Sequence, residues 1–98
     1  MDYRLIWSPE AVDDIEAIGK YIARDSNHYA ASVVQKIFET PQSLLNFPEQ
    51  GRIVPELGDE SIREIFVFQY RIIYKLMNYN ICILTVIHGK RELSKDSL

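Results

Sequence analysis

The chain has 98 residues, of which 47% are hydrophobic and 26% charged, so its composition is that of an ordinary globular domain. This composition disfavours a disordered chain, a collagen and a coiled coil, and at this length we expect no second catalytic domain. We therefore expect one domain over residues 1–98. Its apolar stretches are far shorter than the ~20 residues of a membrane span, and the first residues lack a signal-peptide pattern, so we expect a cytoplasmic protein with no membrane partner.

The net charge of −3 is unevenly divided along the chain. Residues 1–51 hold four Lys/Arg against eight Asp/Glu, which gives −4, whereas residues 52–98 hold seven against six, which gives +1. A protein held to nucleic acid mainly by phosphate contacts usually has a strong basic excess, so this class is disfavoured. Cys82 is the single cysteine, and His28 and His88 are far apart in sequence, so we expect no disulfide, no metal and no other cofactor.

The first half of the chain predicts a strand followed by two helices. Residues 3–7 read as a short strand, after which Ser8, Pro9 and Glu10 supply an N-cap, a proline at the first helical position and an acid in the first turn. Apolar residues spaced by three and four predict the buried face of this first helix: Val12, Ile15, Ile18, Tyr21 and Ile22.

A second helix is expected from about Tyr29, antiparallel to the first because residues 25–27 form only a short connection. Its predicted buried face consists of Ala30, Val33, Val34, Ile37 and Phe38. Pro41 should kink or break the helix near Thr40, because a proline inside a helix removes a backbone hydrogen bond and clashes with the previous turn. We expect Leu44, Leu45 and Phe47 to continue the apolar face, and residues 52–61 to form a loop with a short extended piece.

The second half of the chain predicts a three-stranded antiparallel meander over residues 62–68, 71–77 and 81–87, separated by hairpin-sized gaps. The last strand is apolar on both faces, so we place it in the interior of the sheet. In the middle strand Ile72, Tyr74 and Leu76 share the face that the helices should cover, whereas Arg71, Ile73 and Lys75 share a more polar face that should stay partly open. The expected fold class is α+β.

Five short stretches carry a resemblance to a known family: Trp7–Ala11, Leu44–Glu56, Ile62–Ile65, Tyr70–Tyr74 and Val86–Arg91. In this order they resemble the ParE/RelE superfamily of type II toxin–antitoxin toxins, over essentially the whole chain. The resemblance implies a RelE/ParE-like fold and a bacterial toxin that arrests growth. It also implies a role such as plasmid stabilization and a cognate antitoxin whose C-terminal segment wraps the toxin.

Two activities are open within this superfamily, because the ParE branch poisons DNA gyrase whereas the RelE branch cleaves mRNA on the ribosome. Metal-free RNA cleavage needs a group that takes the 2′-OH proton, a group that protonates the leaving oxygen, and cations for the developing phosphorane charge. Resemblance to RelE-type nucleases would assign these catalytic roles to Glu56, Arg63, Arg71 and His88. If the chain is of the ParE type, it has no catalytic residues.

Three features favour the ParE branch. The net charge is negative, where a nuclease that docks on the ribosome should be basic. The tyrosine typical of the nucleases is absent after His88, and Gly89, Lys90 and Arg91 instead complete the His-Gly-x-Arg ending of the ParE branch. We therefore expect a gyrase poison; the alternatives are a ribosome-dependent mRNA endoribonuclease, an inactive relative, or a non-enzymatic interaction module that binds a partner along its sheet edge and helical groove.

Six basic residues are candidates for contact with the antitoxin or the target: Arg52, Arg63, Arg71, Lys75, His88 and Arg91. We expect the antitoxin to be acidic where it crosses Arg52, Arg63 and Arg71, because complementary charge speeds association. Structural roles compete with these assignments. Cross-strand pairing with Glu56 or Glu64 would account for Arg63 and Arg71 without any partner. The remaining alternatives are a hydrogen-bonded strand end for His88 and packing for Trp7, Tyr70, Tyr74 and Cys82.

Overall fold

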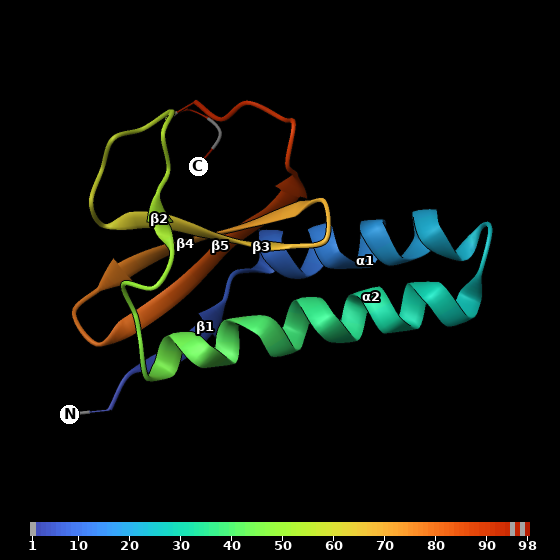
Figure 1. Ribbon diagram of the computed structural model, residues 1–98, viewed down its shortest axis with the longest axis horizontal. Coiled ribbons are helices and arrows are strands. Elements are labelled where there is room, and N and C mark those ends of the chain that lie inside the picture. Colours follow the sequence, from blue (N-terminus) through green and yellow to red (C-terminus); the bar gives the residue numbers. More distant parts are fainter. Residues whose placement is uncertain (1, 95, 97) are drawn as a thin grey trace.

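A computed structural model describes residues 2–94, 96 and 98 of the chain. The elements follow in the order β1 (Arg4–Trp7), α1 (Pro9–Ala23), α2 (Asn27–Glu39), a 3₁₀ helix η1 (Thr40–Leu45), β2 (Arg52–Ile53), β3 (Ile62–Val67), β4 (Tyr70–Met77) and β5 (Asn80–His88). The two helices lie antiparallel on one face of the sheet (Figure 1), which confirms the predicted α+β class. Neither helix in the described part of the chain is long and apolar enough to cross a membrane.

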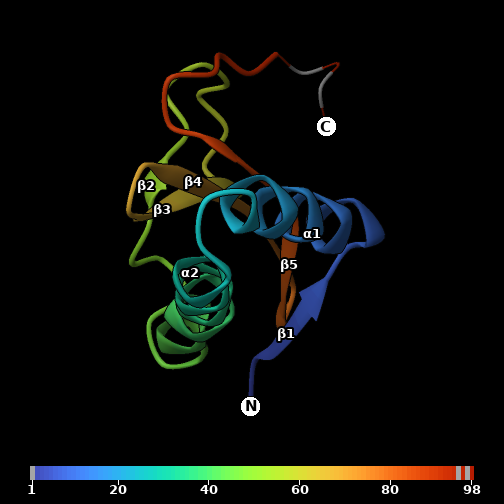
Figure 2. The same ribbon diagram turned by 90° about the vertical axis from the view of Figure 1, so that its right-hand side faces the viewer.

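In the described residues, five strands form one mixed sheet in the order β1-β5-β4-β3-β2. β3, β4 and β5 are the predicted antiparallel meander, and β5 has a neighbour on each side, as its two apolar faces predicted. β1 pairs in parallel with β5, with Leu5 opposite Ile81; Figure 2 shows these two strands side by side. The short extended piece expected after residue 51 is β2, in which Arg52 lies opposite Glu64.

Helix α1 begins where the N-cap predicted, since the Ser8 side chain accepts a hydrogen bond from the Ala11 amide at 3.0 Å. Its buried face differs from the predicted one by a small rotation. Ala11 and Ile15 are buried and Ile18 and Ile22 partly buried, at spacings of four, three and four residues. Val12 and Tyr21 are instead 42% and 67% exposed, because each lies one residue, or about 100° of helix, beside this stripe.

Helix α2 begins at Asn27, two residues before the predicted start, with Ser26 as its N-cap. It ends at Glu39 and becomes 3₁₀ through Pro41, which confirms the expected break near Thr40. The prediction for Phe47 is wrong, since its side chain is 66% exposed. The reason is that η1 ends at Leu45, so Phe47 no longer follows the helical period.

Two further predicted core side chains, Phe38 and Tyr74, are placed by contacts with distant parts of the chain. Phe38 is 37% exposed and packs on Trp7, with ring centroids 4.9 Å apart. Tyr74 is fully buried; its hydroxyl donates to the Pro48 carbonyl at 2.8 Å and accepts from the Gly51 amide at 2.9 Å. A Cβ on Gly51 would lie 2.6 Å from the Tyr74 hydroxyl oxygen, so the chain approaches the sheet here only because this residue is glycine.

A β-bulge interrupts β5. Ile73 is opposite Thr85 but Tyr74 is opposite Ile83, so Leu84 is an extra residue in this strand. As a result, Ile83 and Val86 belong to the core under the helices, whereas Leu84 packs with the cluster on the other face.

The polar groups of the bulge are bound by the start of α1. The Ser8 hydroxyl donates to the Leu84 carbonyl at 2.8 Å. The carboxylate of Asp14 accepts from the Thr85 hydroxyl at 2.5 Å and from the Val86 amide at 3.0 Å. Two side chains of the first helical region therefore fix the irregular part of the last strand.

Replacing Asp14 by alanine should destabilise the fold, because the Val86 amide and the Thr85 hydroxyl lose a charged acceptor in a half-buried place. We expect a loss of about 2 kcal/mol in the free energy of unfolding, measured by urea titration. Asp13→Ala is the matched control, since Asp13 is an exposed neighbour on the same helix. Equal stabilities of the two variants would show that the bulge does not need this carboxylate.

The face opposite the helices has a small core of its own, although we expected it to be partly open. Val54, Ile73, Ile87 and Leu93 are buried together there. The loop between β2 and β3 and the chain after β5 supply part of this cluster, and Figure 1 shows both lying across the sheet from the helices. We call residues 89–94 the C-terminal segment.

Candidate functional site

Four charged side chains meet on the face opposite the helices: Arg52 of β2, Glu56 of the following loop, Glu64 of β3 and Arg71 of β4. We call them the charge cluster. The Glu64 carboxylate is shared, since one oxygen accepts from Arg71 Nε and the other from Arg52 Nε, each at 2.5 Å. The side chains of Glu64 and Arg71 are 0% and 4% exposed, so their charges are compatible with burial only because they are paired.

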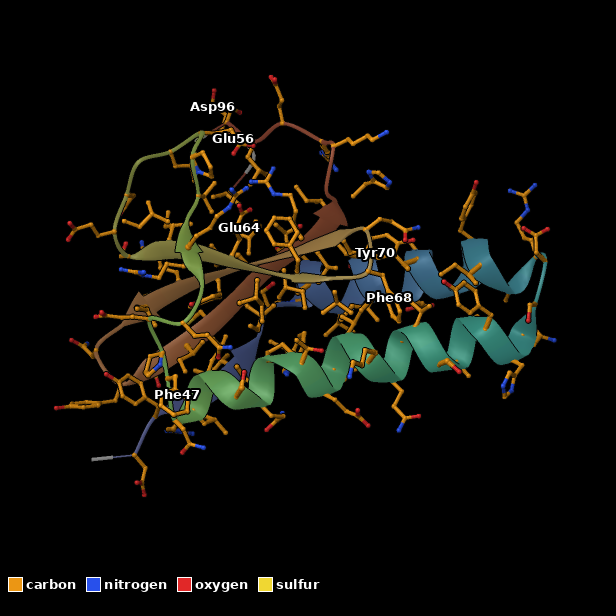
Figure 3. The ribbon with its side chains drawn as sticks, in the orientation of Figure 1. Phe47, Glu56, Glu64, Phe68, Tyr70 and Asp96 are labelled. Atoms are coloured by element: carbon orange, nitrogen blue, oxygen red, sulfur yellow. The ribbon has the colours of Figure 1, made fainter. Side chains whose placement is uncertain are left out.

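Glu56 closes the cluster from the solvent side, as Figure 3 shows above Glu64. Arg71 binds it through two bonds, from Nη1 to Oε2 at 2.7 Å and from Nη2 to Oε1 at 2.9 Å, the bidentate geometry of a strong guanidinium–carboxylate pair. The hydrogen bonds from Arg71 lower the pKa of Glu56 from 4.5 to about 2. The same bonds raise the pKa of Arg71 above its ordinary value, so both groups are charged at neutral pH.

The lowered pKa of Glu56 makes a prediction about acid stability. A carboxylate whose pKa falls on folding stabilises the native state fully above its unfolded pKa of 4.5, and this contribution disappears as the pH drops towards 2. Wild type should therefore be more stable than Glu56→Gln at about pH 6, with the gap narrowing towards about pH 3. Thermal unfolding across this range measures it, with Glu60→Gln as the control for an exposed carboxylate of the same loop. Parallel pH profiles for wild type and Glu56→Gln would contradict it.

The charge cluster also binds the C-terminal segment through its backbone. Arg71 Nη1 donates to the Arg91 carbonyl at 2.9 Å, and the Leu93 amide donates to Glu56 Oε2 at 3.1 Å. The cluster thus joins three strands, the loop after β2 and the C-terminal segment.

The sheet separates the four residues that a RelE-type nuclease would need. Arg71 points to the face with Glu56, because its neighbours Tyr70 and Ile72 belong to the core under the helices. His88 of β5 lies opposite Tyr70 of β4, and the centroids of their rings are 6.1 Å apart. His88 also lines a surface hollow together with side chains of α1. His88 therefore lies on the helix side of the sheet, away from Glu56 and Arg71.

Arg63 is on the helix side as well, because it is directly opposite Tyr74. Its guanidinium donates to backbone carbonyls of Glu49, Gly51 and Glu60, so it fastens the loop before β2. The predicted pairing with a carboxylate is therefore correct for Arg71 and wrong for Arg63.

The six candidate contact residues differ in how accessible they are. Arg71 is buried in the charge cluster and would have to leave it to touch a partner. Arg52 is 58% exposed and lies over the Phe66 ring, 5.2 Å from its centre. Lys75 is half-buried, while His88 and Arg91 are exposed near the end of the described chain.

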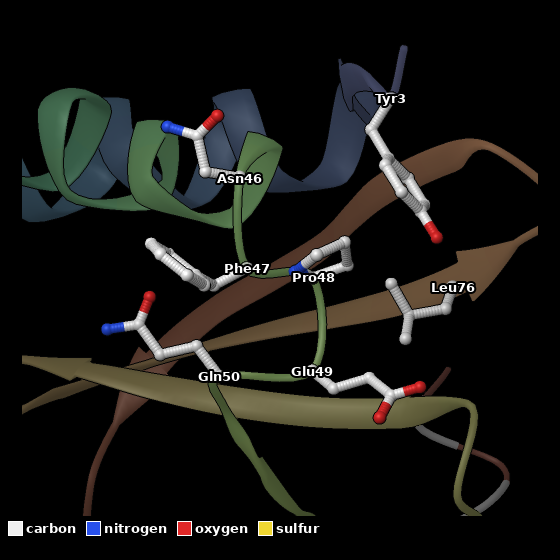
Figure 4. Close-up of a pocket in the computed structure, with 7 residues that line it drawn as sticks. All are labelled: Tyr3, Asn46, Phe47, Pro48, Glu49, Gln50 and Leu76. Atoms are coloured by element: carbon white, nitrogen blue, oxygen red, sulfur yellow. The ribbon is translucent and has the colours of Figure 1, made fainter. Parts of the chain in front are cut away.

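A surface hollow of about 630 Å³ opens near the loop before β2. Figure 4 shows the side chains that line it: Tyr3, Asn46, Phe47, Pro48, Glu49, Gln50 and Leu76. The exposed Phe47 forms one wall of this hollow. This side chain, which we predicted to be in the core, therefore contributes to an apolar surface instead. In the described part of the chain, no three His, Cys, Asp or Glu side chains gather as metal ligands would.

Sequence reasoning missed the central role of Glu64 and the role of Asp14. From the sequence we consider Glu64 only as one of two possible partners of an arginine, although a carboxylate between Ile62 and Phe66 on a strand of period two is a signal for a buried ion pair. Asp14 next to the buried Ile15 is a similar, weaker signal.

A family model described as the ParE toxin of the type II toxin–antitoxin system parDE matches residues 5–93. The chain belongs to the ParE toxin family. Its structure is similar to a chain of the chromosomal ParDE system of P. aeruginosa, with a TM-score of 0.75, 22% identity, and coverage of 90% of this chain and 97% of that one. A search of curated proteins found no significant match.

Two further solved structures share this fold with the ParE-family chain. The RelBE2 toxin–antitoxin complex of Mycobacterium tuberculosis gives a TM-score of 0.60 at 20% identity, covering 90% of this chain and 99% of that one. A mutant of the E. coli toxin RelE in the free state gives 0.66 at 15% identity, covering 92% and 86%. At these identities the similarity shows the fold and leaves the target open.

Proposed function

We propose that this ParE-family chain arrests bacterial growth by poisoning DNA gyrase and is neutralised by a cognate antitoxin. Membership of the ParE family supports the toxin class. The observation that favours gyrase over mRNA is the position of His88 on one face of the sheet and of Glu56 and Arg71 on the other. A proton donor and a proton acceptor must both reach one phosphodiester to cleave RNA, and groups on opposite faces of a sheet do not.

The state of Glu56 supports the same conclusion. A general base works best with a pKa near the operating pH, whereas the pKa of Glu56 is about 2. Its oxygens already accept two hydrogen bonds from Arg71 and one from the Leu93 amide. The charge of Arg71 is likewise matched by Glu56 and Glu64, so little of it would remain for a phosphorane.

Exposed apolar side chains support the antitoxin as a partner. Tyr21, Phe47 and Phe68 are 67%, 66% and 55% exposed, and Phe47 lines the hollow of Figure 4. In that hollow Phe47 lies with the apolar side chains of Tyr3, Pro48 and Leu76, and a contiguous apolar patch of this kind is typical of a binding surface. The ParDE and RelBE2 structures are toxin–antitoxin systems by their descriptions. Because Arg52 is the exposed cation of the charge cluster, we propose that the antitoxin is acidic where it crosses β2.

The proposal is tested by expressing the chain in bacteria with and without its cognate antitoxin, which we expect to be the product of the neighbouring gene. We expect growth arrest without that product, DNA breaks that depend on gyrase, and intact mRNA on the ribosomes. The purified chain should stabilise the gyrase–DNA cleavage complex in vitro. Ribosome-dependent mRNA cleavage would overturn the gyrase assignment. If the chain binds the product of the neighbouring gene but does not affect growth, it is an interaction module.

Replacing His88 by alanine distinguishes a gyrase poison from an mRNA endoribonuclease. A gyrase poison breaks no bond of its own, so we expect a graded loss of growth inhibition of less than about 10-fold, whereas loss of a general acid or base typically costs about 10²–10⁴-fold. The assay compares growth at matched protein levels and measures antitoxin binding in parallel. His28→Ala is the control, because His28 is an exposed histidine at the start of α2. A 100-fold loss with antitoxin binding intact would favour a nuclease.

A further inference from the structure

The C-terminal segment is fixed against the sheet, although it has no regular secondary structure. The Gly89 amide donates to the Gln69 carbonyl at 2.6 Å, and the Arg91 amide to the His88 carbonyl at 3.0 Å. The Leu93 side chain is 7% exposed and packs in the small core with Val54 and Ile87.

Two of the bonds that fix this segment come from the charge cluster. Arg71 holds the Arg91 carbonyl, and Glu56 holds the Leu93 amide. Both bonds depend on where the Arg71 guanidinium points, because its Nη atoms serve Glu56 and the Arg91 carbonyl together. A guanidinium is planar, so fixing Nε on one side fixes the direction of both Nη atoms.

Glu64 is the group that fixes Nε. Its carboxylate accepts from Arg71 Nε at 2.5 Å and is itself buried and held by Arg52. We infer that Glu64 is a positioning residue for the C-terminal segment: acting through Arg71 and Glu56, it holds the segment in the conformation that growth inhibition requires. The inference rests on the proposed toxin function for its last step alone.

The side chains carried by the segment explain why its conformation matters. The two arginines and two carboxylates of the charge cluster balance each other's charge, whereas Lys90 and Arg91 are exposed. The cluster holds Arg91 by its carbonyl, so its guanidinium is not used in that contact, and the residue lines a surface hollow together with Glu10 and Asp14. The buried charges thus position the backbone that carries the exposed Lys90 and Arg91.

Amide hydrogen exchange of the purified full chain, followed by NMR, tests the positioning role without reference to any target. In Glu56→Ala the Leu93 amide loses its acceptor and should exchange at least about tenfold faster, while amides of α2 and β4 keep their protection. Glu64→Gln should show the same local change, although no bond joins Glu64 to Leu93 in the described contacts. If Glu64→Gln fails to fold, Glu64→Asp gives the same readout, because it keeps the charge and withdraws the carboxylate by one methylene. Glu60→Ala is the control.

Growth inhibition by the same variants tests whether the toxin needs the C-terminal segment in this fixed conformation. Glu56→Ala, whose site is at the surface, should still fold but inhibit growth at least about tenfold less than wild type. Glu60→Ala should inhibit growth as strongly as wild type. Unchanged exchange at Leu93 in the Glu64 variants, or equally faster exchange at all amides, would overturn the positioning role. Faster exchange at Leu93 with full growth inhibition would overturn the need for a fixed segment. Neither outcome depends on whether gyrase is the target, which the cleavage-complex assay decides.

Discussion

Replacing Arg71 by methionine is expected to lower the free energy of unfolding by about 3–5 kcal/mol, the usual cost of removing one partner of a buried ion pair. The methionine fills similar space but leaves the fully buried Glu64 with Arg52 as its described partner, and Arg52 is 58% exposed. Glu56 loses its bidentate contact at the same time. For a domain of this size the Tm should fall by on the order of 15–30 °C.

A double variant tests the cause of this loss. Arg71→Met combined with Glu64→Met removes both buried charges, so it should recover a large part of the stability lost in Arg71→Met alone. Urea and thermal unfolding of wild type, both single variants and the double variant give the coupling energy between the two residues. If the double variant is as unstable as the sum of the single variants, the charge pairing is not the source of the effect.

Saturation with the cognate antitoxin should raise stability by a comparable amount. A partner that binds only the native state contributes about 4 kcal/mol at a free concentration of 1,000 times its Kd, and the Tm should rise by about 15–30 °C. The physical reason is that the exposed apolar side chains, such as Tyr21, Phe47 and Phe68, become buried.

The antitoxin used in this measurement is the product of the neighbouring gene, and an unrelated antitoxin is the control. The effect should grow with antitoxin concentration, as mass action requires. Repeating the titration with Phe47→Ser, which removes one exposed apolar side chain from the hollow, should reduce the gain. A Tm that stays constant under saturating antitoxin would mean that the neighbour does not bind the native chain.

Local chemistry explains the elements that the sequence predicted correctly. Ser8 and Pro9 start α1, Pro41 ends α2, and Asn78 adopts the left-handed conformation that the second hairpin turn needs, with φ of 56°. Each signal acts within a few residues, so no knowledge of the fold is required to use it. The interior place of β5 follows equally well, because apolar residues on both faces of a strand must both be covered.

Positions that depend on packing were predicted less well. Val12 and Tyr21 fit the helical period but lie beside the buried stripe of α1, because the sheet decides which side of a helix is covered. Phe68 adopts a left-handed conformation, with φ of 54°, in the first hairpin turn, a place that sequence patterns do not assign to an aromatic residue. The parallel pairing of β1 with β5 joins residues more than 70 positions apart, which no local signal encodes.

The sequence by itself determined the order of the elements, the α+β class and the residues that could carry chemistry. The tertiary structure alone decided which of these residues meet. With strict alternation from Ile83, His88 would point to the same face as Arg71; the extra residue Leu84 shifts the alternation by one and places His88 opposite Tyr70, on the helix side. This bulge is held by Asp14 from a helix about 70 residues earlier, so its effect on His88 is a property of the folded chain.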